Sequence, residues 1–229
     1  MNNQELARMM DLSCVRADST LHEIDKTVKL AVEHNIYAIF VLPAHMPYLI
    51  EQTAGTSILP AATVGFPSGA ASTAVKVAEV REQLALGCRE FDMVGNIAWL
   101  KAGMDDRYRN DIRAVIDAAD GMPVKVILEC HYLTEDEIVR ACNLAVEAGV
   151  AFVKTGTGWA PTGATVENVT LMKQVVGDRC QVKAAGGVSD RATLLALHRA
   201  GASRFGIGTR TARSILEASP CEVPQANTY

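Results

Sequence analysis

Short apolar runs of strand length alternate with longer helical segments along the chain, and this alternation most restricts the fold. Several runs are almost continuously apolar, such as IYAIFVL from Ile36 and VKVIL from Val124. Such runs are typical of parallel strands buried on both faces. We predict eight strands, at Arg8–Ser13, Ile36–Leu42, Leu59–Gly65, Arg89–Val94, Pro123–Glu129, Ala151–Thr155, Cys180–Ala184 and Ser203–Ile207.

The segments between these strands carry signals for helix ends. Thr20 with Glu23 and Thr134 with Glu137 fit the capping box, in which two side chains satisfy free amides at a helix start. Gly149 fits a helix C-terminus that leads into the next strand. About eight helices therefore alternate with the eight strands.

The number of β–α units predicts the architecture. A chain of 229 residues with eight such units and no Pro- or Ser-rich linker matches one (β/α)8 TIM barrel, an α/β fold of roughly 250 residues. A doubly wound open sheet is the alternative, but its usual G-x-G-x-x-G or Walker motif does not occur in the sequence. We expect a single domain over residues 1–229, with residues 218–229 as a flexible tail.

The composition argues against several classes of protein. With 49% hydrophobic and 21% charged residues, the chain does not resemble a disordered or coiled-coil protein, and its net charge of −4 gives no basic surface for nucleic acid. The longest apolar run is far shorter than the ~20 residues of a membrane helix. The polar N-terminus shows no secretory signal. We expect a cytoplasmic protein with a small-molecule partner, no nucleic-acid or membrane partner, and a homodimer as the assembly to test.

The cysteines and histidines do not have the spacing of a metal site. The six cysteines contain no C-x-x-C pair, so we expect reduced, mostly buried thiols. The five histidines show no H-E-x-x-H motif. On a strand, Glu129 and His131 would share a face while Cys130 points away, and two ligands do not make a site. We therefore expect no metal and no cofactor.

Charged residues close several of the predicted strands, where barrel enzymes place their active sites. Any one of them alone is explained equally well by an ion pair at the barrel rim. The whole set is harder to explain in this way, because unpaired charge inside a barrel is costly. The residues in question are Asp11, Asp92, Glu129, Lys154 and Lys183.

Two of these residues form a lysine pair. Lys154 and Lys183 lie one β–α unit apart, so neighbouring parallel strands, about 4.8 Å apart, place them at similar height. Burial and like-charge repulsion both favour a neutral amine, which is the nucleophile that forms a Schiff base with a carbonyl compound. Asp92, two strands away, can move protons to and from the intermediates. These residues suffice for carbon–carbon bond chemistry without a metal.

Five segments around the candidate residues form a recognisable pattern: Val64–Gly69 (VGFPSG), Glu90–Asn96 (EFDMVGN), Lys125–Glu129 (KVILE), Phe152–Gly158 (FVKTGTG) and Val182–Val188 (VKAAGGV). Through these segments the chain resembles the deoxyribose-phosphate aldolase family from about Asp11 to Ile215. The resemblance implies a class I aldolase on a (β/α)8 barrel, which cleaves 2-deoxy-D-ribose 5-phosphate reversibly to D-glyceraldehyde 3-phosphate and acetaldehyde. It also implies that Lys154 forms the Schiff base, that Lys183 perturbs it and relays protons, and that Asp92 donates and accepts protons.

Glycine turns after the later strands are the candidates for substrate binding. Barrels often bind phosphate on the backbone amides of such turns, and the family uses them similarly. The terminal Tyr229 resembles a tyrosine whose tail assists proton transfer in some family members, and a frayed terminus is the alternative. The predicted substrate- and phosphate-binding residues are Gly158, Gly186, Gly187, Gly206, Gly208 and Thr209.

The sequence departs from the family pattern where phosphate is expected to bind. Ser189 stands where the family has arginine, and Gly208-Thr209, followed by Arg210, replaces a serine pair. The opening segment Asp11–Ala17 also differs from the usual D-H-T-L-L-K-P. Because arginine gives bidentate, charge-assisted bonds to phosphate, we predict weaker discrimination between deoxyribose 5-phosphate and free deoxyribose than the family norm. Arg210 is the nearby cation that could compensate, and the alternative is that it faces solvent at the start of a helix.

Three alternatives to this function remain at this stage. The first is an aldolase of the same family that acts on a different or non-phosphorylated carbonyl compound. The second is a barrel sugar-phosphate isomerase or epimerase, which more often needs a glutamate base or a metal. The third is a non-enzymatic binding or scaffold protein, against which the costly lysine pair argues.

Overall fold

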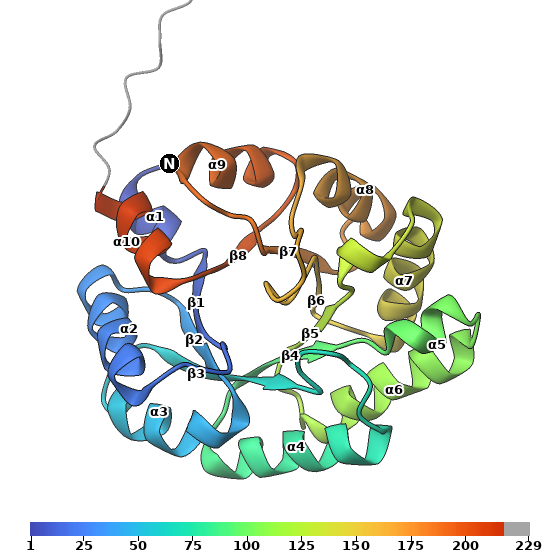
Figure 1. The fold of residues 1–229 in the computed structure, drawn as a ribbon, viewed down its shortest axis with the longest axis horizontal. Coiled ribbons are helices and arrows are strands. Elements are labelled where there is room, and N and C mark those ends of the chain that lie inside the picture. The colour runs from blue at the N-terminus through green and yellow to red at the C-terminus, as the bar shows by residue number, and fades with distance from the viewer. Residues whose placement is uncertain (218–229) are drawn as a thin grey trace, which may run out of the picture.

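Eight parallel strands close into a barrel in the order β1-β2-β3-β4-β5-β6-β7-β8 in the computed structural model, which describes residues 1–217 (Figure 1). All eight predicted strands are present, and the (β/α)8 architecture is confirmed. The strands are β1 Met10–Cys14, β2 Ala38–Val41, β3 Leu59–Val64, β4 Glu90–Val94, β5 Val124–Ile127, β6 Phe152–Lys154, β7 Gln181–Ala185 and β8 Arg204–Ile207.

The helices form an outer ring around the barrel (Figure 1). The predicted capping boxes are present at Thr20 and Thr134, and Gly149 ends its helix with φ 91°. The helices are α1 Asn3–Ala7, α2 Leu21–His34, α3 Met46–Thr53, α4 Thr73–Leu86, α5 Ile97–Lys101, α6 Asp105–Ala118, α7 Glu135–Ala148, α8 Val166–Val176, α9 Arg191–Arg199 and α10 Thr209–Glu217, with 3-10 turns η1 at Pro43–His45 and η2 at Cys130–Tyr132.

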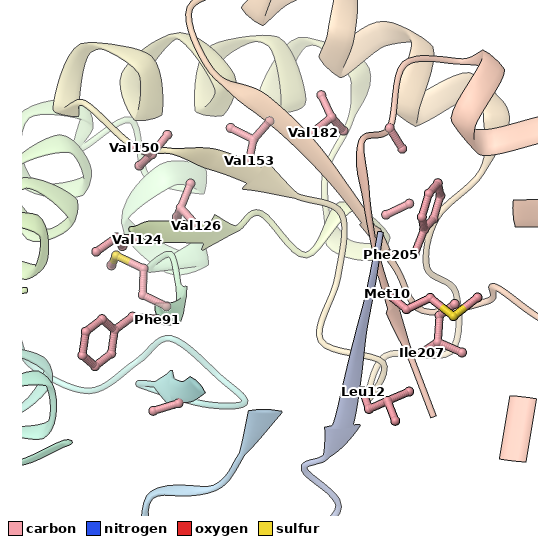
Figure 2. Packing of buried hydrophobic residues seen from close by; sticks show 14 of the residues in the cluster. Met10, Leu12, Phe91, Val124, Val126, Val150, Val153, Val182, Phe205 and Ile207 are labelled. Atoms are coloured by element: carbon pink, nitrogen blue, oxygen red, sulfur yellow. The ribbon is translucent and has the colours of Figure 1, made fainter. Parts of the chain in front are cut away.

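Alternation along each strand separates the core from the lumen. On β5, Val124 and Val126 belong to the large apolar cluster between the barrel and the helices (Figure 2), whereas Lys125 between them contacts charged groups inside the barrel. A smaller apolar cluster contains Phe40 and Ala61, from β2 and β3. The lumen therefore has uncharged side chains beside β2 and β3 and charged side chains beside the other six strands.

One prediction about β5 is wrong. The predicted strand to Glu129 ends at Ile127, because Glu129 adopts a left-handed conformation with φ 56° and starts η2. Glu129 and His131 therefore do not share a strand face. The Glu129 carboxylate accepts from the Thr157 amide, while His131 Nδ1 lies 2.7 Å from the Thr162 hydroxyl.

The five cysteines in the described part of the chain are free and buried, as predicted, and Cys221 lies outside the described residues.

Within residues 1–217, no three His, Cys, Asp or Glu side chains form a group that could hold a metal ion. None of the helices described here combines the length and apolar character that crossing a membrane requires.

Candidate active site

Three charged side chains from β4, β6 and β7 meet at one oxygen atom. Lys154 and Lys183 are direct register partners, as the spacing predicts. The Nζ atom of each lysine donates a 2.7 Å hydrogen bond to Oδ2 of Asp92. Asp92 and Lys183 are fully buried, and Lys154 is 5% exposed. The structure thus brings together all three residues predicted to be catalytic.

Lys154 is poised to lose its proton near neutral pH. Burial, together with the positive charges of Lys183 and Lys125, lowers its pKa to about 8, although the Asp92 carboxylate opposes this shift. The expected effect of Lys183 on Lys154 therefore agrees with the direction found in the structure. The neutral amine therefore becomes available at lower pH than for an ordinary lysine.

Lys183 and Asp92 both hold their charges. Burial alone would lower the pKa of Lys183, but the carboxylates of Asp11 and Asp92 outweigh it and raise that pKa. Burial alone would raise the pKa of Asp92, but Lys154, Lys183 and Lys125 hold it well below its usual value. The two lysines therefore differ: the pKa of Lys183 is raised, and the pKa of Lys154 is lowered.

A second layer of buried charge lies behind these three residues. Asp11 Oδ2 is 2.6 Å from Lys183 Nζ, and Asp11 Oδ1 is 2.9 Å from Arg204. Lys125 Nζ is 2.8 Å from Glu90 and 3.4 Å from Asp92. The Lys183 ammonium also lies 3.9 Å from the centre of the Phe40 ring, a cation–π contact that partly replaces water.

Three members of this layer, Lys125, Glu90 and Arg204, are not among the charged residues predicted to close the strands. A later ionisable residue follows Lys125 and Glu90 in their predicted strands, and Arg204 lies near the start of its strand rather than at its end. Lys125 did carry a signal, since a lysine inside a buried apolar strand needs a partner in the lumen. Its register partner on β4 is Asp92.

A cavity of about 290 Å³ opens at the carboxyl ends of the strands, with Lys154 among its lining residues. Five of the six predicted substrate-binding residues line it. Gly186 and Gly187 have φ values of +79° and +81°, which residues with a side chain rarely adopt. The lining glycines are Gly158, Gly186, Gly187, Gly206 and Gly208.

Glu129 organises the turn after Lys154. Its carboxylate accepts hydrogen bonds from the Thr157 amide and from the Thr157 hydroxyl. A Cβ atom on Gly156 would lie 2.7 Å from Glu129 Oε1, so a side chain at this position would displace the Glu129 carboxylate. Glu129 thus positions the loop that carries the cavity wall.

The three polar residues at the predicted phosphate end, Thr209, Ser189 and Arg210, do not line the cavity. Thr209 does not line the cavity, because its hydroxyl hydrogen-bonds with the Thr27 hydroxyl at 2.6 Å; Thr211 lines it instead. The Ser189 hydroxyl donates to Asp190 at 2.7 Å. Neither Ser189 nor the exposed Arg210 is among the cavity residues.

The prediction of a proton relay at Tyr229 falls outside the described residues, as does the predicted tail at 218–229.

Comparison with known proteins identifies the family. The model of the DeoC/LacD family aldolases matches residues 5–218. The chain belongs to this family. It is 43% identical over 206 residues to the deoxyribose-phosphate aldolase of Mannheimia succiniciproducens, covering 90% of this chain and 92% of that protein. It is 46% identical over 200 residues to that of Staphylococcus epidermidis, covering 87% and 91% respectively.

A solved structure supports the same conclusion. An aldolase named QR15 superposes with a TM-score of 0.87 at 33% identity, over 92% of this chain and 94% of that one. The observed barrel is therefore the fold of a known aldolase.

Proposed function

We propose that this chain cleaves 2-deoxy-D-ribose 5-phosphate reversibly to D-glyceraldehyde 3-phosphate and acetaldehyde, through a Schiff base on Lys154. One observation carries the assignment: the amine whose pKa is lowered to about 8 faces the cavity, and a carboxylate shared with a protonated lysine holds it there. The names of the relatives supply the substrate, and the geometry supplies the nucleophile.

Imine formation uses the three residues in distinct roles. Neutral Lys154 Nζ attacks the aldehyde carbon of the open-chain sugar and then carries a surplus proton. Asp92 Oδ2, 2.7 Å away, is ionised in the resting site and accepts that proton. Lys183 Nζ donates a hydrogen bond to the same Asp92 oxygen, so its positive charge stays beside the Asp92 carboxyl group while the carbinolamine loses water.

Bond cleavage follows from the electron-poor imine. The proton leaves the C3 hydroxyl, the C2–C3 bond breaks, and its electron pair moves toward the iminium nitrogen to give an enamine. D-Glyceraldehyde 3-phosphate departs, C2 takes up a proton, and water releases acetaldehyde and the free Lys154 amine. The buried site favours these steps because fixed charges act more strongly where water is excluded.

Reductive trapping tests the assignment. Borohydride with acetaldehyde should add one reduced imine adduct to the peptide that contains Lys154. Lys154→Ala should abolish the adduct and lower turnover roughly 10⁴- to 10⁶-fold, as for loss of a covalent nucleophile. Lys173→Ala, which removes a lysine paired with Asp178 outside the cavity, is the matched control and should retain the adduct. An adduct on Lys183 with full activity in Lys154→Ala would overturn the assignment.

One observation keeps a non-phosphorylated carbonyl substrate as the second candidate. Apart from Lys154, the only cationic side chain among the described cavity residues is Arg16, which is 77% exposed and paired with Asp18 at 2.9 Å. A free cation would give phosphate strong charge-assisted hydrogen bonds, and the described lining side chains supply no cation besides this paired arginine and Lys154.

We also propose a homodimer in the cytoplasm. Light scattering checks the assembly, and fractionation of the source cells checks the location.

A further inference from the structure

A second buried ion pair lies outside the cluster of charges in the lumen, where α4 and α6 are neighbours in the outer ring (Figure 1). Lys76 on α4 is fully buried, and its Nζ atom donates a 2.6 Å hydrogen bond to Oδ2 of Asp111 on α6. The Thr73 hydroxyl, also on α4, donates to Asp111 Oδ1 at 2.7 Å. Two donors from α4 therefore hold the Asp111 carboxylate.

The Lys76 ammonium also reaches the strand that carries Asp92. Its Nζ atom donates a 2.9 Å hydrogen bond to the carbonyl oxygen of Val94, the last residue of β4. Val94 lies two residues beyond Asp92, whose Oδ2 atom accepts from both lysines of the lumen. The backbone that places the Asp92 carboxylate is thus held from outside the barrel by Lys76.

The alkyl chain of Lys76 supports the end of the neighbouring strand β3. Gly65 directly follows β3, and a Cβ atom there would lie 2.7 Å from Lys76 Cε, so the lysine chain packs directly against this glycine. The Gly65 amide also donates to Oε2 of Glu79 on α4 at 2.7 Å. The next residue, Phe66, lines the cavity. Helix α4 therefore holds the ends of both β3 and β4 at the mouth of the barrel.

Stability alone is a poor explanation for this ion pair. Removing two charges from water costs free energy, and well-packed apolar residues of similar volume often stabilise a fold as well or better. Apolar residues cannot supply a directed N–H bond to the Val94 carbonyl oxygen. The arrangement therefore suits a requirement for the position of β4.

We propose that Lys76 is a positioning residue for the reaction, which fixes the carboxyl end of β4 and thereby sets the distance between Asp92 Oδ2 and Lys154 Nζ. Lys76 does not line the cavity and acts only through the strand. The inference rests on the proposed function and deepens it, because it gives the same active site a support outside the barrel.

The titration of Lys154 reports where Asp92 lies. Three charged groups face Lys154: Asp92 from β4, Lys183 from β7 and Lys125 from β5. Of these three, only Asp92 raises the pKa of Lys154, and only Asp92 lies on the strand that Lys76 holds. Moving Asp92 away should therefore lower the pKa of Lys154 and shift the pH midpoint of imine trapping toward acid. A loss of stability alone leaves that midpoint unchanged.

Two double variants remove both charges together, so that neither is left buried alone. Lys76→Met/Asp111→Leu makes the pair apolar. Lys76→Met/Asp111→Asn keeps an acceptor for the Thr73 hydroxyl and covers the case in which the apolar pair folds poorly. Both variants lack the donor to Val94.

The experiment measures cleavage of deoxyribose 5-phosphate and borohydride trapping of acetaldehyde, both across pH. In each variant, kcat per trappable Lys154 should fall by about tenfold, because a small misplacement of a catalytic group is costly. KM should stay within about twofold, because Lys76 makes no contact with the substrate. The trapping midpoint should move toward acid.

The matched control removes an ion pair between α6 and α7. Arg109 and Glu147 are 3.3 Å apart and accessible to solvent. Arg109→Gln/Glu147→Gln should therefore leave kcat and the trapping midpoint unchanged.

The outcomes separate this inference from the proposed function. If either Lys76→Met variant folds and keeps the wild-type kcat and trapping midpoint, or loses activity with an unchanged midpoint, the positioning role is overturned and the proposed function stands. If acetaldehyde gives no adduct on Lys154 in the wild type, the proposed function fails, and this inference fails with it.

Discussion

The base of the cavity and its outer wall are built in opposite ways. At the base, charged groups from β1, β4, β5, β6, β7 and β8 contact one another at 2.6 to 3.9 Å. At the outer wall, glycine turns and the edge-to-face Phe66–Trp159 ring pair predominate, and the Arg16 side chain that lines it is exposed and paired with Asp18. The strands hold the charged side chains of the candidate active site, and the loops between strands and helices line the part of the cavity that determines substrate specificity.

The charges at the base also explain why one lysine differs from the other. Three acids, Asp11, Glu90 and Asp92, face four bases. With every group ionised the set carries one surplus positive charge, and it becomes neutral when one lysine loses its proton. We assign that proton to Lys154, since its side chain is in contact with the cavity and its pKa is lowered. The remaining bases are Lys125, Lys183 and Arg204.

The largest effect on turnover is expected for Asp92, whose carboxylate accepts a hydrogen bond from both lysines. Asp92→Asn should lower turnover by ~10²–10⁴-fold, as for loss of a general acid–base group. The Asp92 charge raises the pKa of Lys154, so its removal should also move the pH dependence of imine trapping toward acid. Reductive trapping and kcat, both measured across pH, separate these effects. Unchanged turnover would break the assignment of Asp92.

A stability measurement tests whether the second layer is a single network. Lys125→Met should destabilise the fold by about 3–5 kcal/mol, because it leaves Glu90 buried without its partner. The matched control is Arg213→Met, which breaks the exposed pair with Glu217 and should cost too little to resolve in the same denaturant titration. Equal midpoints for the two variants would show that the buried layer adds nothing to stability.

Lys183→Leu is expected to shift the pH dependence in the direction opposite to that of Asp92→Asn. Lys183→Leu removes a positive charge that lowers the pKa of Lys154, so the rising limb of the pH–rate profile should move toward alkaline pH. Turnover should fall about 10²-fold as proton relay is lost. A shift in the same direction for both variants would contradict the electrostatic account of the lysine pair.

The base of the site was predictable from sequence because its residues interrupt buried strands. A lysine such as Lys154 at the end of an apolar run has few explanations, and the regular β–α repeat sets Lys183 beside it. Asp11 was found by the same criterion. Lys125 was missed because it lies inside its strand rather than at the end.

The outer wall was less predictable because loop conformation decides it. Thr209 follows a glycine at a strand end, as a phosphate-binding residue does, yet its hydroxyl bonds to Thr27 on α2. Trp159 carried no signal on its own, since a single exposed aromatic residue is common on protein surfaces. Its contact with Phe66 and its indole hydrogen bond to the Val15 carbonyl depend on loop conformation, and they place the ring in the cavity wall.

The smallest effects are expected at the predicted phosphate end. We expect wild-type kcat/KM to differ little between deoxyribose 5-phosphate and free deoxyribose, because the described lining side chains offer the phosphate no free cation. Ser189→Arg should raise kcat/KM for the phosphorylated sugar about tenfold, near the low end for hydrogen bonds to charged groups, since the position is exposed. Arg210→Ala should change either value less than about twofold, because an exposed charge outside the cavity is screened by water. A wild type that strongly prefers the phosphorylated sugar, with neither substitution altering that preference, would contradict this expectation. Backbone amides of Gly186 and its neighbours would then bind phosphate without side-chain help, and the scarcity of charged side chains at the outer wall would not decide which sugar is preferred.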